Sequence, residues 1–267
     1  MTTSTTQAEH LKSALLEGAG FSHAFFTRYG GVSEGAYKSL NFSYAVGDSH
    51  SHVDANFQLA ARSLGVRTER LFLLSQVHGN RVVELGGEEE RRHVLFTEGD
   101  ALVTGAAMTA CGVRTADCIP VLLADPTTGR VASAHAGWRG IESRVLENTV
   151  KRLSTAPSRC IAAIGPHISE AAFEVSADVG RRLKAAGLGI HCVRETANQK
   201  AHVSLGDIAE FQLRRAGVVM LEQVRGCTFS EPDRFFSYRR QGKRSGRHLS
   251  AIVARESDSG APRRTSS

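Results

Sequence analysis

The sequence has no segment typical of a membrane or secreted protein. Its 267 residues contain no run approaching the roughly 20 apolar residues of a membrane-spanning helix, so we expect no membrane partner. The first ten residues, MTTSTTQAEH, have neither a cationic start nor an apolar core, which argues against a secretory signal. The five cysteines are odd in number and include no C-x-x-C pair, so neither a disulfide framework nor a zinc ribbon is expected. A cytoplasmic location fits this cysteine usage best.

The sequence also lacks the common signatures of nucleotide- and nucleic-acid-binding proteins. It has no Walker loop, no G-x-G-x-x-G after a predicted strand and no recognisable nucleic-acid-binding fold, so we expect no specific nucleic acid partner. The formal net charge of +6 is confined to the C-terminal end: residues 225–267 hold ten basic and four acidic residues, whereas the rest of the chain holds 23 of each sign. This distribution predicts a local patch that attracts anions.

No repeat, low-complexity tract or linker divides the chain. We therefore predict one domain over residues 11–255, with disordered ends at residues 1–10 and 256–267. Hydrophobic residues make up 41% and charged residues 22% of the sequence, which is ordinary for a globular protein and excludes a mostly disordered chain.

Predicted helices and strands interleave irregularly along this domain. Apolar residues recur at helical spacing in four segments, residues 51–65, 138–153, 176–187 and 204–217. Short β-branched or apolar runs predict six strands, residues 71–74, 81–85, 101–104, 119–125, 130–136 and 160–165. Pro-Thr-Thr-Gly joins two of these runs, 119–125 and 130–136, and predicts an antiparallel hairpin. The fourth helix opens with Ser204 and Asp207, close to a capping box. The class is α/β or α+β.

Three segments place a candidate metal ligand next to or near glycine at the end of a predicted strand. They are SQVHGN with His78, TADCIP with Cys118 and HAGWRG with His135. The ligand separations of 40 and 17 residues are too wide for a local finger, so only the fold could assemble a site. Two imidazoles and one thiolate suit Zn²⁺ and leave a fourth position for water or substrate, as in catalytic sites.

The residue types alone leave other interpretations of these three residues open. A histidine in a strand-end loop is more often a surface or hydrogen-bonding residue than a ligand. Cys118 precedes the apolar run IPVLL and could be a small core residue. Cys118 and His135 could also form a nucleophile–base pair without a metal.

Two basic segments are candidates for binding anions. FTRYGGVS (26–33) carries Arg28 before paired glycines, which suits an anion or merely a salt-bridged turn. FFSYRR (235–240) opens the basic end, which continues through Lys243, Arg244 and Arg247. Guanidinium groups bind phosphate through paired charge-assisted hydrogen bonds, although a solubilising surface strand would have the same composition.

Taken together in this order, the segments resemble the YfiH-type family, also called laccase-domain or multicopper polyphenol oxidase proteins and generally regarded as purine nucleoside phosphorylases. The resemblance covers about residues 21–255. Besides the segments already quoted, it rests on SQVHGNRVV (75–83), EGDALVT (98–104), TADCIPVLLAD (115–125), IGPHIS (164–169) and SGRHLSAIVA (245–254).

The resemblance implies a fold, a metal and an activity. The fold is a single α+β domain of mixed β-sheets flanked by helices, a YfiH-like fold. The cofactor is a catalytic Zn²⁺, with Cu²⁺ as a possible substitute, bound by His78, Cys118 and His135. The activity is phosphorolysis of adenosine, inosine, guanosine and methylthioadenosine, with adenosine deamination at the same site. The partners are then purine nucleosides and phosphate, and no oligomeric state is predicted.

Further residues receive candidate roles from this family function. Arg28 and Arg239 are candidates to hold phosphate, and Gln76 is a candidate to contact substrate. Asp117, beside the thiolate, either orients a zinc ligand or moves protons, unless it makes only an ordinary strand-end hydrogen bond. Arg139 contacts substrate or forms a structural ion pair.

The chain departs from the family pattern at three positions, none of them a ligand. The segment from Asn41 reads Asn-Phe-Ser-Tyr where the family usually has Asn-Leu-Gly. His167 replaces the usual cysteine and Ser204 the usual aspartate before the fourth helix. A pocket-facing His167 would change the polarity of the pocket and titrate near neutrality.

Three other functions compete with phosphorolysis. Copper-dependent polyphenol oxidation needs a histidine-rich trinuclear cluster, and the chain has one His-x-His pair, His50-Ser-His52. An amidase that edits peptidoglycan precursors could use the same zinc. A non-catalytic anion- or RNA-binding module would bind with a steep salt dependence that survives loss of zinc.

Overall fold

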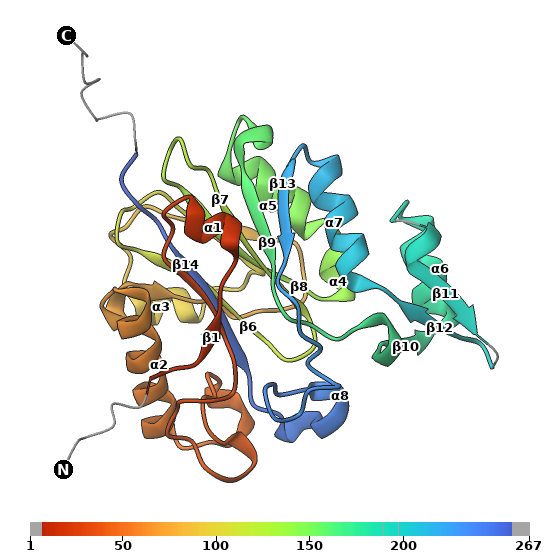
Figure 1. Ribbon diagram of the computed structural model, residues 1–267, viewed down its shortest axis with the longest axis horizontal. Coiled ribbons are helices and arrows are strands. Elements are labelled where there is room, and N and C mark those ends of the chain that lie inside the picture. Colours follow the sequence, from red (N-terminus) through yellow and green to blue (C-terminus); the bar gives the residue numbers. More distant parts are fainter. Residues whose placement is uncertain (1–6, 189, 197, 258–267) are drawn as a thin grey trace.

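The computed structural model describes residues 7–188, 190–196 and 198–257 (Figure 1). Most strands belong to two mixed sheets. One has five strands in the spatial order β1 (His10–Leu11), β2 (His23–Phe26), β14 (His248–Val253), β6 (Ala110–Thr115) and β3 (Leu71–Phe72). The other has six strands in the order β13 (Met220–Gln223), β9 (Ile161–Ile164), β7 (Ile119–Ala124), β8 (Val131–Ala136), β5 (Ala101–Thr104) and β4 (Val82–Leu85).

These two sheets pack face to face around an apolar core. Phe25, Phe72 and Ile252 of the five-stranded sheet meet Leu102 and Leu122 of the six-stranded sheet. Strands β7 and β8 are buried along their whole length because both faces of their sheet are covered. This explains why they appear in the sequence as continuous apolar runs.

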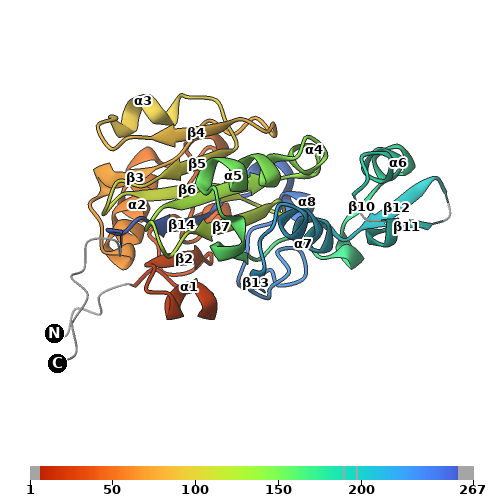
Figure 2. The ribbon, with the colours of Figure 1, turned by 90° about the horizontal axis from the view of Figure 1, so that it is seen from above.

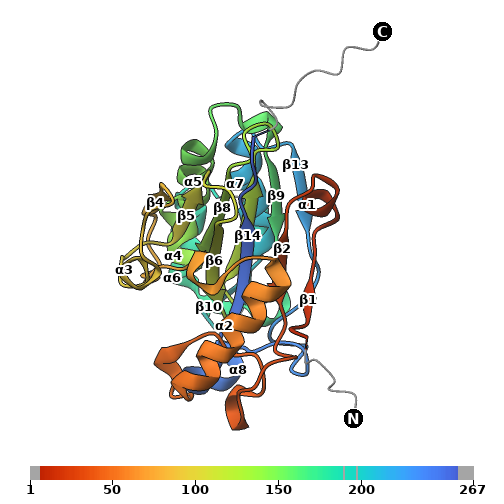
Figure 3. The ribbon, with the colours of Figure 1, turned by 90° about the vertical axis from the view of Figure 1, so that its left-hand side faces the viewer.

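Helices cover the two outer faces. Helix α2 (His50–Leu64) packs on the outer face of the five-stranded sheet (Figure 3). Helices α5 (Val145–Leu153) and α7 (Leu205–Arg215) pack on the outer face of the six-stranded sheet. Shorter helices connect the strands: α1 (Ala14–Gly18), α3 (Arg91–Leu95), α4 (Trp138–Glu142) and α8 (Tyr238–Gln241).

A small antiparallel unit stands at one end of the molecule (Figure 2). It contains β10 (Glu174–Ser176), β12 (Lys200–Val203) and β11 (Val193–Thr196), covered by α6 (Ala177–Ala185). The paired guanidinium nitrogens of Arg182 on α6 bind the carboxylate of Glu142 on α4 at 2.8 and 2.6 Å. This unit therefore packs beside the helix that follows β8.

The fold class and several predicted elements are confirmed. The structure is an α+β fold of mixed sheets flanked by helices, and the predicted hairpin is the antiparallel pair β7–β8. The helix predicted over residues 51–65 is α2, which ends at Gly65 in the left-handed conformation (φ 75°). Across the described residues, no helix combines the length and the apolar character needed to cross a membrane.

Three predictions of local structure are wrong. The helix expected over residues 138–153 is two helices, α4 and α5, because Arg144 between them has a left-handed backbone (φ 67°). Residues 73 and 74 leave the strand after Phe72. The hydroxyl of Ser204 donates to Asp207 Oδ2 at 2.6 Å and accepts no backbone N–H, so no capping box forms.

The expected disordered ends are only partly described by the structure. Residues 1–6 and 258–267 lie outside the described residues. In the described part, Ala8 is buried and the Glu9 amide donates to the Tyr29 carbonyl at 3.1 Å.

Candidate metal centre and cavity

Three chain segments meet where the chain passes from one large sheet to the other. The chain leaves the five-stranded sheet at Thr115 and enters the six-stranded sheet at Ile119, so Cys118 lies in the crossing turn. Pairing of Pro120 with His135 brings the end of β8 beside this turn. The loop between β3 and β4 contributes His78.

The fold assembles the three predicted ligands into one group. The ligand atoms of His78, Cys118 and His135 all lie within 4.8 Å of one another. Cys118 Sγ lies 3.9 Å from His78 Nε2. Tetrahedral zinc with ordinary bond lengths requires ligand atoms roughly 3.3–3.6 Å apart, so small side-chain movements would complete the site. The donor set and the spacing both fit Zn²⁺.

Gly137 leaves the space that this group needs. A Cβ at position 137 would lie 3.0 Å from Cys118 Sγ and 3.0 Å from His78 Cδ2. Any side chain there would press on two of the three ligands. This is the structural reason for glycine in the HAGWRG segment.

Asp100, which directly precedes β5, holds two of the ligands in place. Its fully buried carboxylate accepts from His135 Nδ1 at 2.8 Å, from the His78 amide at 3.0 Å and from the Gly79 amide at 2.7 Å. Burial raises the pKa of Asp100, but the hydrogen bonds from His135 and these amides outweigh it and lower the pKa overall. The ionised carboxylate requires a proton on His135 Nδ1, so Nε2 is free to bind a metal. The same bonds fix the left-handed backbone of His78 (φ 60°).

The charges within the group favour a cation. Burial opposes ionisation of the Cys118 thiol, but the His135 and His78 side chains outweigh it and lower its pKa to about 6. Burial also disfavours the charged form of His135, yet the Cys118 thiolate and the Asp100 carboxylate raise its pKa to about 9. Both shifts favour the thiolate form of Cys118 and the charged form of His135 when no metal is bound, and the geometry also accommodates the nucleophile–base alternative.

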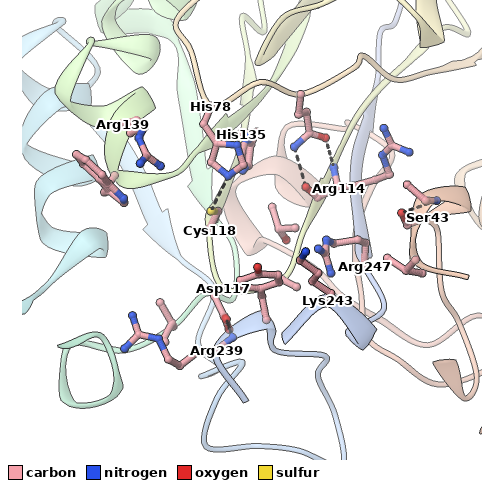
Figure 4. Close-up of a pocket in the computed structure, with 18 of the residues that line it drawn as sticks. Ser43, His78, Arg114, Asp117, Cys118, His135, Arg139, Arg239, Lys243 and Arg247 are labelled. Atoms are coloured by element: carbon pink, nitrogen blue, oxygen red, sulfur yellow. Dashed lines mark hydrogen bonds between the residues drawn. The ribbon is translucent and has the colours of Figure 1, made fainter. Parts of the chain in front are cut away.

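A cavity of about 730 Å³ opens on these ligands (Figure 4). This volume is within the range of small-molecule sites. One side of the cavity is apolar. This apolar wall belongs to the cluster of hydrophobic residues that packs on the outer face of the six-stranded sheet, and it consists of Trp138, Ile168, Phe173 and Leu205. The cationic wall consists of Arg114, Lys243 and Arg247. In Figure 4, Arg139 lies to the left of Cys118 and the cationic wall to its right.

Three predicted substrate residues line the cavity, but two of them also have structural bonds. Both amide atoms of Gln76 pair with the backbone of Arg114 at 2.8 Å, which ties its loop to β6. Arg239 Nη1 donates to the Glu174 carbonyl at 2.8 Å. The exposed Arg139 guanidinium stacks 4.5 Å from the Trp138 ring centroid.

The structure does not bring Arg28 to the cavity. Its Nε donates to the Lys38 carbonyl at 2.9 Å and its Nη1 to the Pro232 carbonyl at 2.8 Å. The guanidinium carbon lies 4.6 Å from the Phe236 ring centroid. Arg28 therefore fastens its own turn to the C-terminal segment, and its position does not support a contact with phosphate.

Asp117 also lines the cavity, but both of its carboxylate oxygens already accept hydrogen bonds. Oδ1 accepts from Thr228 Oγ1 at 2.7 Å, and Oδ2 accepts from the Arg239 amide at 2.6 Å. Its backbone is left-handed (φ 90°). Asp117 therefore fastens the turn that carries Cys118 to the C-terminal part of the chain.

The three departures from the family pattern lie away from the ligands. His167 does not line the cavity: it is half-buried, its Nδ1 contacts the Gly165 carbonyl at 2.9 Å, and burial lowers its pKa. The considered pocket-facing His167 is therefore not observed. Ser204 does not line the cavity either. Asn41 Oδ1, by contrast, accepts from the Arg247 amide at 2.9 Å, so its segment positions part of the cationic wall.

Sequence reasoning missed Asp100 and Arg114 as site residues. A carboxylate directly before a buried strand was the available signal for Asp100. The basic end was identified only as a group: Lys243 and Arg247 reach the cavity, whereas Arg244 does not and Arg240 donates to three backbone carbonyls.

Comparison with known proteins gives a match over nearly the whole domain. The family model described as multi-copper polyphenol oxidoreductase laccase matches residues 22–255. A purine nucleoside phosphorylase of Deinococcus radiodurans is 38% identical over 245 residues, which cover 91% of this chain and 90% of that protein. The purine nucleoside phosphorylase YfiH of Escherichia coli is 37% identical over 230 residues, covering 85% and 90%.

Solved structures show the same fold. YlmD from Geobacillus stearothermophilus superposes with a TM-score of 0.85 at 30% identity, over 93% of this chain and all of that one. The protein YfiH of Bacillus licheniformis superposes with a TM-score of 0.85 at 26% identity, over 90% and 94% of the two chains.

Proposed function

Because the chain belongs to the YfiH-type, laccase-domain family, we propose that it catalyses phosphorolysis of purine nucleosides. The observation that supports this most directly is the composition of the cavity. Three metal-ligand side chains meet an apolar wall suited to a flat base and a cationic wall suited to an anion. A nucleoside and a phosphate need these two kinds of surface together.

We propose Zn²⁺, held by His78, Cys118 and His135, as the resident metal. The three ligand atoms have the spacing and the donor types of a catalytic zinc site. When bound, the ion supplies a Lewis acid that acidifies water at the open fourth position. Cu²⁺ is the expected substitute, because two imidazoles and a thiolate also suit copper.

In phosphorolysis the protein mainly has to position two reactants. An oxygen of HPO₄²⁻ forms a bond to ribose C1′ while the bond from C1′ to purine N9 breaks, and the electron pair and the phosphate proton go to the base. The products are ribose 1-phosphate and the free purine. Trp138 and Phe173 offer apolar surfaces for the purine, and Arg139 and Arg239 are candidate substrate contacts at the rim. Asp117 and Gln76 act as positioning residues through their backbone partners.

The same cavity would accept the other family substrates. Adenosine deamination replaces the amino group at C6 with the oxygen of water and releases ammonia. Methylthioadenosine differs from adenosine at the 5′ position, so its phosphorolysis requires the same bonds to form and break. We include both activities in the proposal, and analysis of the reaction products tests them.

One experiment separates these activities. Metal-analysed protein is incubated with adenosine, with and without phosphate, and adenine, inosine and hypoxanthine are resolved. Phosphate-dependent adenine release supports phosphorolysis, whereas inosine alone supports deamination without it. If neither product forms and His78→Ala leaves another activity intact, the proposal is overturned.

Copper-dependent oxidation of phenols is the second candidate, because the matching family model carries that description. The described residues contain one group of three candidate ligands, His78, Cys118 and His135. We therefore expect phenol oxidation, if it occurs, to be weak and to require added copper. The amidase and the anion-binding module would show instead as amide hydrolysis, or as salt-dependent binding that persists without metal.

A further inference from the structure

The cationic wall is assembled by strand pairing next to the metal ligands. In the β6–β14 pair, Leu249 lies opposite Arg114 and His248 opposite Thr115, so Arg247 follows at the same end of the sheet. Lys243 lies in the single turn Gly242–Arg244 that precedes this strand. The β6 strand then runs directly into the turn that carries Cys118. Arg114 on β6, Arg247 just before β14 and Lys243 in the preceding turn thus bring three cations to one cavity (Figure 4).

The backbone around Arg247 is fixed from both sides. Its amide donates to Asn41 Oδ1 at 2.9 Å, and its carbonyl accepts from the Phe42 amide at 3.0 Å. Its Nη1 donates to the Ser245 and Gly246 carbonyls at 2.7 and 3.0 Å. These bonds use one terminal nitrogen and leave Nε and Nη2 for a ligand. The guanidinium is therefore oriented before any ligand arrives.

The three cations have no carboxylate partner of their own. Among the described residues, none of Arg114, Lys243 and Arg247 forms an ion pair, and the one side-chain bond of Arg114 goes to the Leu74 carbonyl at 3.0 Å. Burial, together with the smaller effect of the nearby Arg247 charge, lowers the pKa of Arg114 to about 10. Like charges held together in a half-buried wall repel one another until an anion enters.

The anionic groups near this wall already have partners. Burial lowers the pKa of Arg247, while the Cys118 and Asp117 charges act in the opposite direction, so Arg247 lies close to both. The Asp117 carboxylate accepts from Thr228 and from the Arg239 amide. The Cys118 thiolate belongs to the metal group. Neither can serve as the counter-ion that three cations need.

We propose that Arg114, Lys243 and Arg247 form the phosphate subsite of this enzyme, and that Arg28 does not. This inference rests on the proposed function. The wall lies beside the metal ligands in the same cavity, so a phosphate held there would lie near a nucleoside resting on the apolar wall. Paired and charge-assisted hydrogen bonds from guanidinium and ammonium groups suit a tetrahedral dianion. We assign inorganic phosphate as the ligand of this subsite. The phosphoryl group of a nucleotide has the same charge and shape and is the alternative ligand that the test distinguishes.

The test compares Lys243→Met with Arg244→Met. Both residues are exposed cations in the same turn, but only Lys243 lines the cavity. In phosphorolysis of inosine, K243M should raise the KM for phosphate roughly 10- to 100-fold, with little change in the KM for inosine, while R244M stays within about twofold of the wild type. Arg247→Lys keeps the charge but loses the planar guanidinium group that can donate two parallel hydrogen bonds. This variant should raise the KM for phosphate to a smaller extent than K243M.

A binding measurement makes the test independent of activity. Titration calorimetry of zinc-loaded protein with inorganic phosphate should show the same loss of affinity in K243M and none in R244M. Equal phosphate affinity in wild type, K243M and R247K would overturn the subsite, even if the wild type is an active phosphorylase. If K243M binds inosine 5′-monophosphate more weakly than the wild type but binds inorganic phosphate equally well, the subsite is overturned as a site for inorganic phosphate. Absence of wild-type phosphorolysis would instead count against the proposed function, and the calorimetry would still decide the subsite.

Discussion

At the residue scale, the metal group depends on Asp100, a carboxylate that never reaches the cavity. It fixes the proton on His135 Nδ1 and accepts from the amides of His78 and Gly79. The three ligands could be predicted from the sequence, because it shows directly that histidine, cysteine and glycine stand at the ends of predicted strands. It left Asp100 without a role, because the sequence does not show which groups donate to this carboxylate.

Asp100→Asn should weaken zinc binding without unfolding the protein. Asparagine keeps the shape but loses the negative charge, so we expect zinc affinity to fall about 10- to 100-fold. Competition with a chromophoric chelator measures this change. Asp125→Asn is the matched control, since Asp125 is equally buried but bonds Ser154 and the Thr127 amide far from the ligands. Equal zinc affinity in wild type and D100N would contradict the role given to Asp100.

Gly137→Ala should reduce metal content. The added Cβ would lie 3.0 Å from two ligand side chains. We expect substoichiometric zinc by elemental analysis, with the fold retained by circular dichroism. Gly18→Ala is the control, since nothing lies within 4 Å of a Cβ there. Full zinc occupancy in G137A would show that the space over the ligands is not needed.

His248 should make the protein sensitive to mild acid. It is buried, its Nε2 accepts from the Phe236 amide at 2.8 Å, and burial lowers its pKa to about 3. The unfolded state binds a proton near pH 6.5 and the folded state does not, so this contribution to stability is complete above pH 6.5 and is lost as the pH falls toward 3.

Urea unfolding between pH 7 and pH 4 measures this loss. The slope contributed by His248 approaches about 1.4 kcal/mol per pH unit. His248→Gln keeps an acceptor for Phe236 but does not titrate, so its unfolding free energy should depend less on pH than that of the wild type. Parallel pH profiles would rule out His248 as the source.

At the element scale, continuous apolar runs predicted the buried strands β7 and β8, whereas the equally buried strands β2 and β14 were not predicted. Strands β7 and β8 and helix α2 follow their apolar patterns. The break between α4 and α5 escaped prediction because Ile141 and Val145 both pack in the core, so the apolar spacing runs across the break. Strand β6 was missed because Gly112 and Arg114 interrupt its apolar run, yet Arg114 reaches the cavity.

Arg144→Gly should stabilise the protein, because Arg144 lies between these helices in the left-handed conformation (φ 67°). Glycine adopts this backbone at lower cost, so we expect the free energy of unfolding to rise by about 0.5–1 kcal/mol. The ion pair of the exposed Arg144 with Glu147, at 3.7 Å, is a small loss. Arg152→Gly, inside α5, should instead lower the free energy of unfolding by about 1 kcal/mol. Urea unfolding of both variants decides the point, and destabilisation by R144G would refute it.

At the scale of the whole molecule, the metal group lies at the crossing between the two large sheets. Cys118 is in the turn that leaves β6 for β7, His135 ends β8, and His78 comes from the loop after β3. No sequence pattern shows that residues 40 and 17 positions apart converge, because convergence depends on the order of strands in both sheets. Family resemblance provided that information, and the resemblance also carried the prediction for Arg28, which the geometry does not support.

Removal of zinc should destabilise the whole domain in one transition. A ligand that binds only the folded state adds stability in proportion to the logarithm of its concentration over Kd, about 2.7 kcal/mol at one hundred times Kd. We expect chelation to lower the Tm of the wild type and to leave the Tm of Cys118→Ser nearly unchanged. Differential scanning calorimetry measures both proteins. A Tm of the zinc-loaded wild type that does not respond to chelation would contradict a metal held by His78, Cys118 and His135 in the folded state.

The most direct test of the account is the product balance of the zinc-loaded protein with adenosine and inorganic phosphate. Adenine and ribose 1-phosphate are quantified together in wild type and in Cys118→Ser. The account predicts that the wild type forms the two products in equal amounts and only with phosphate present, and that the variant loses most of this activity. Zinc-loaded wild type that releases no ribose 1-phosphate from any purine nucleoside would contradict it.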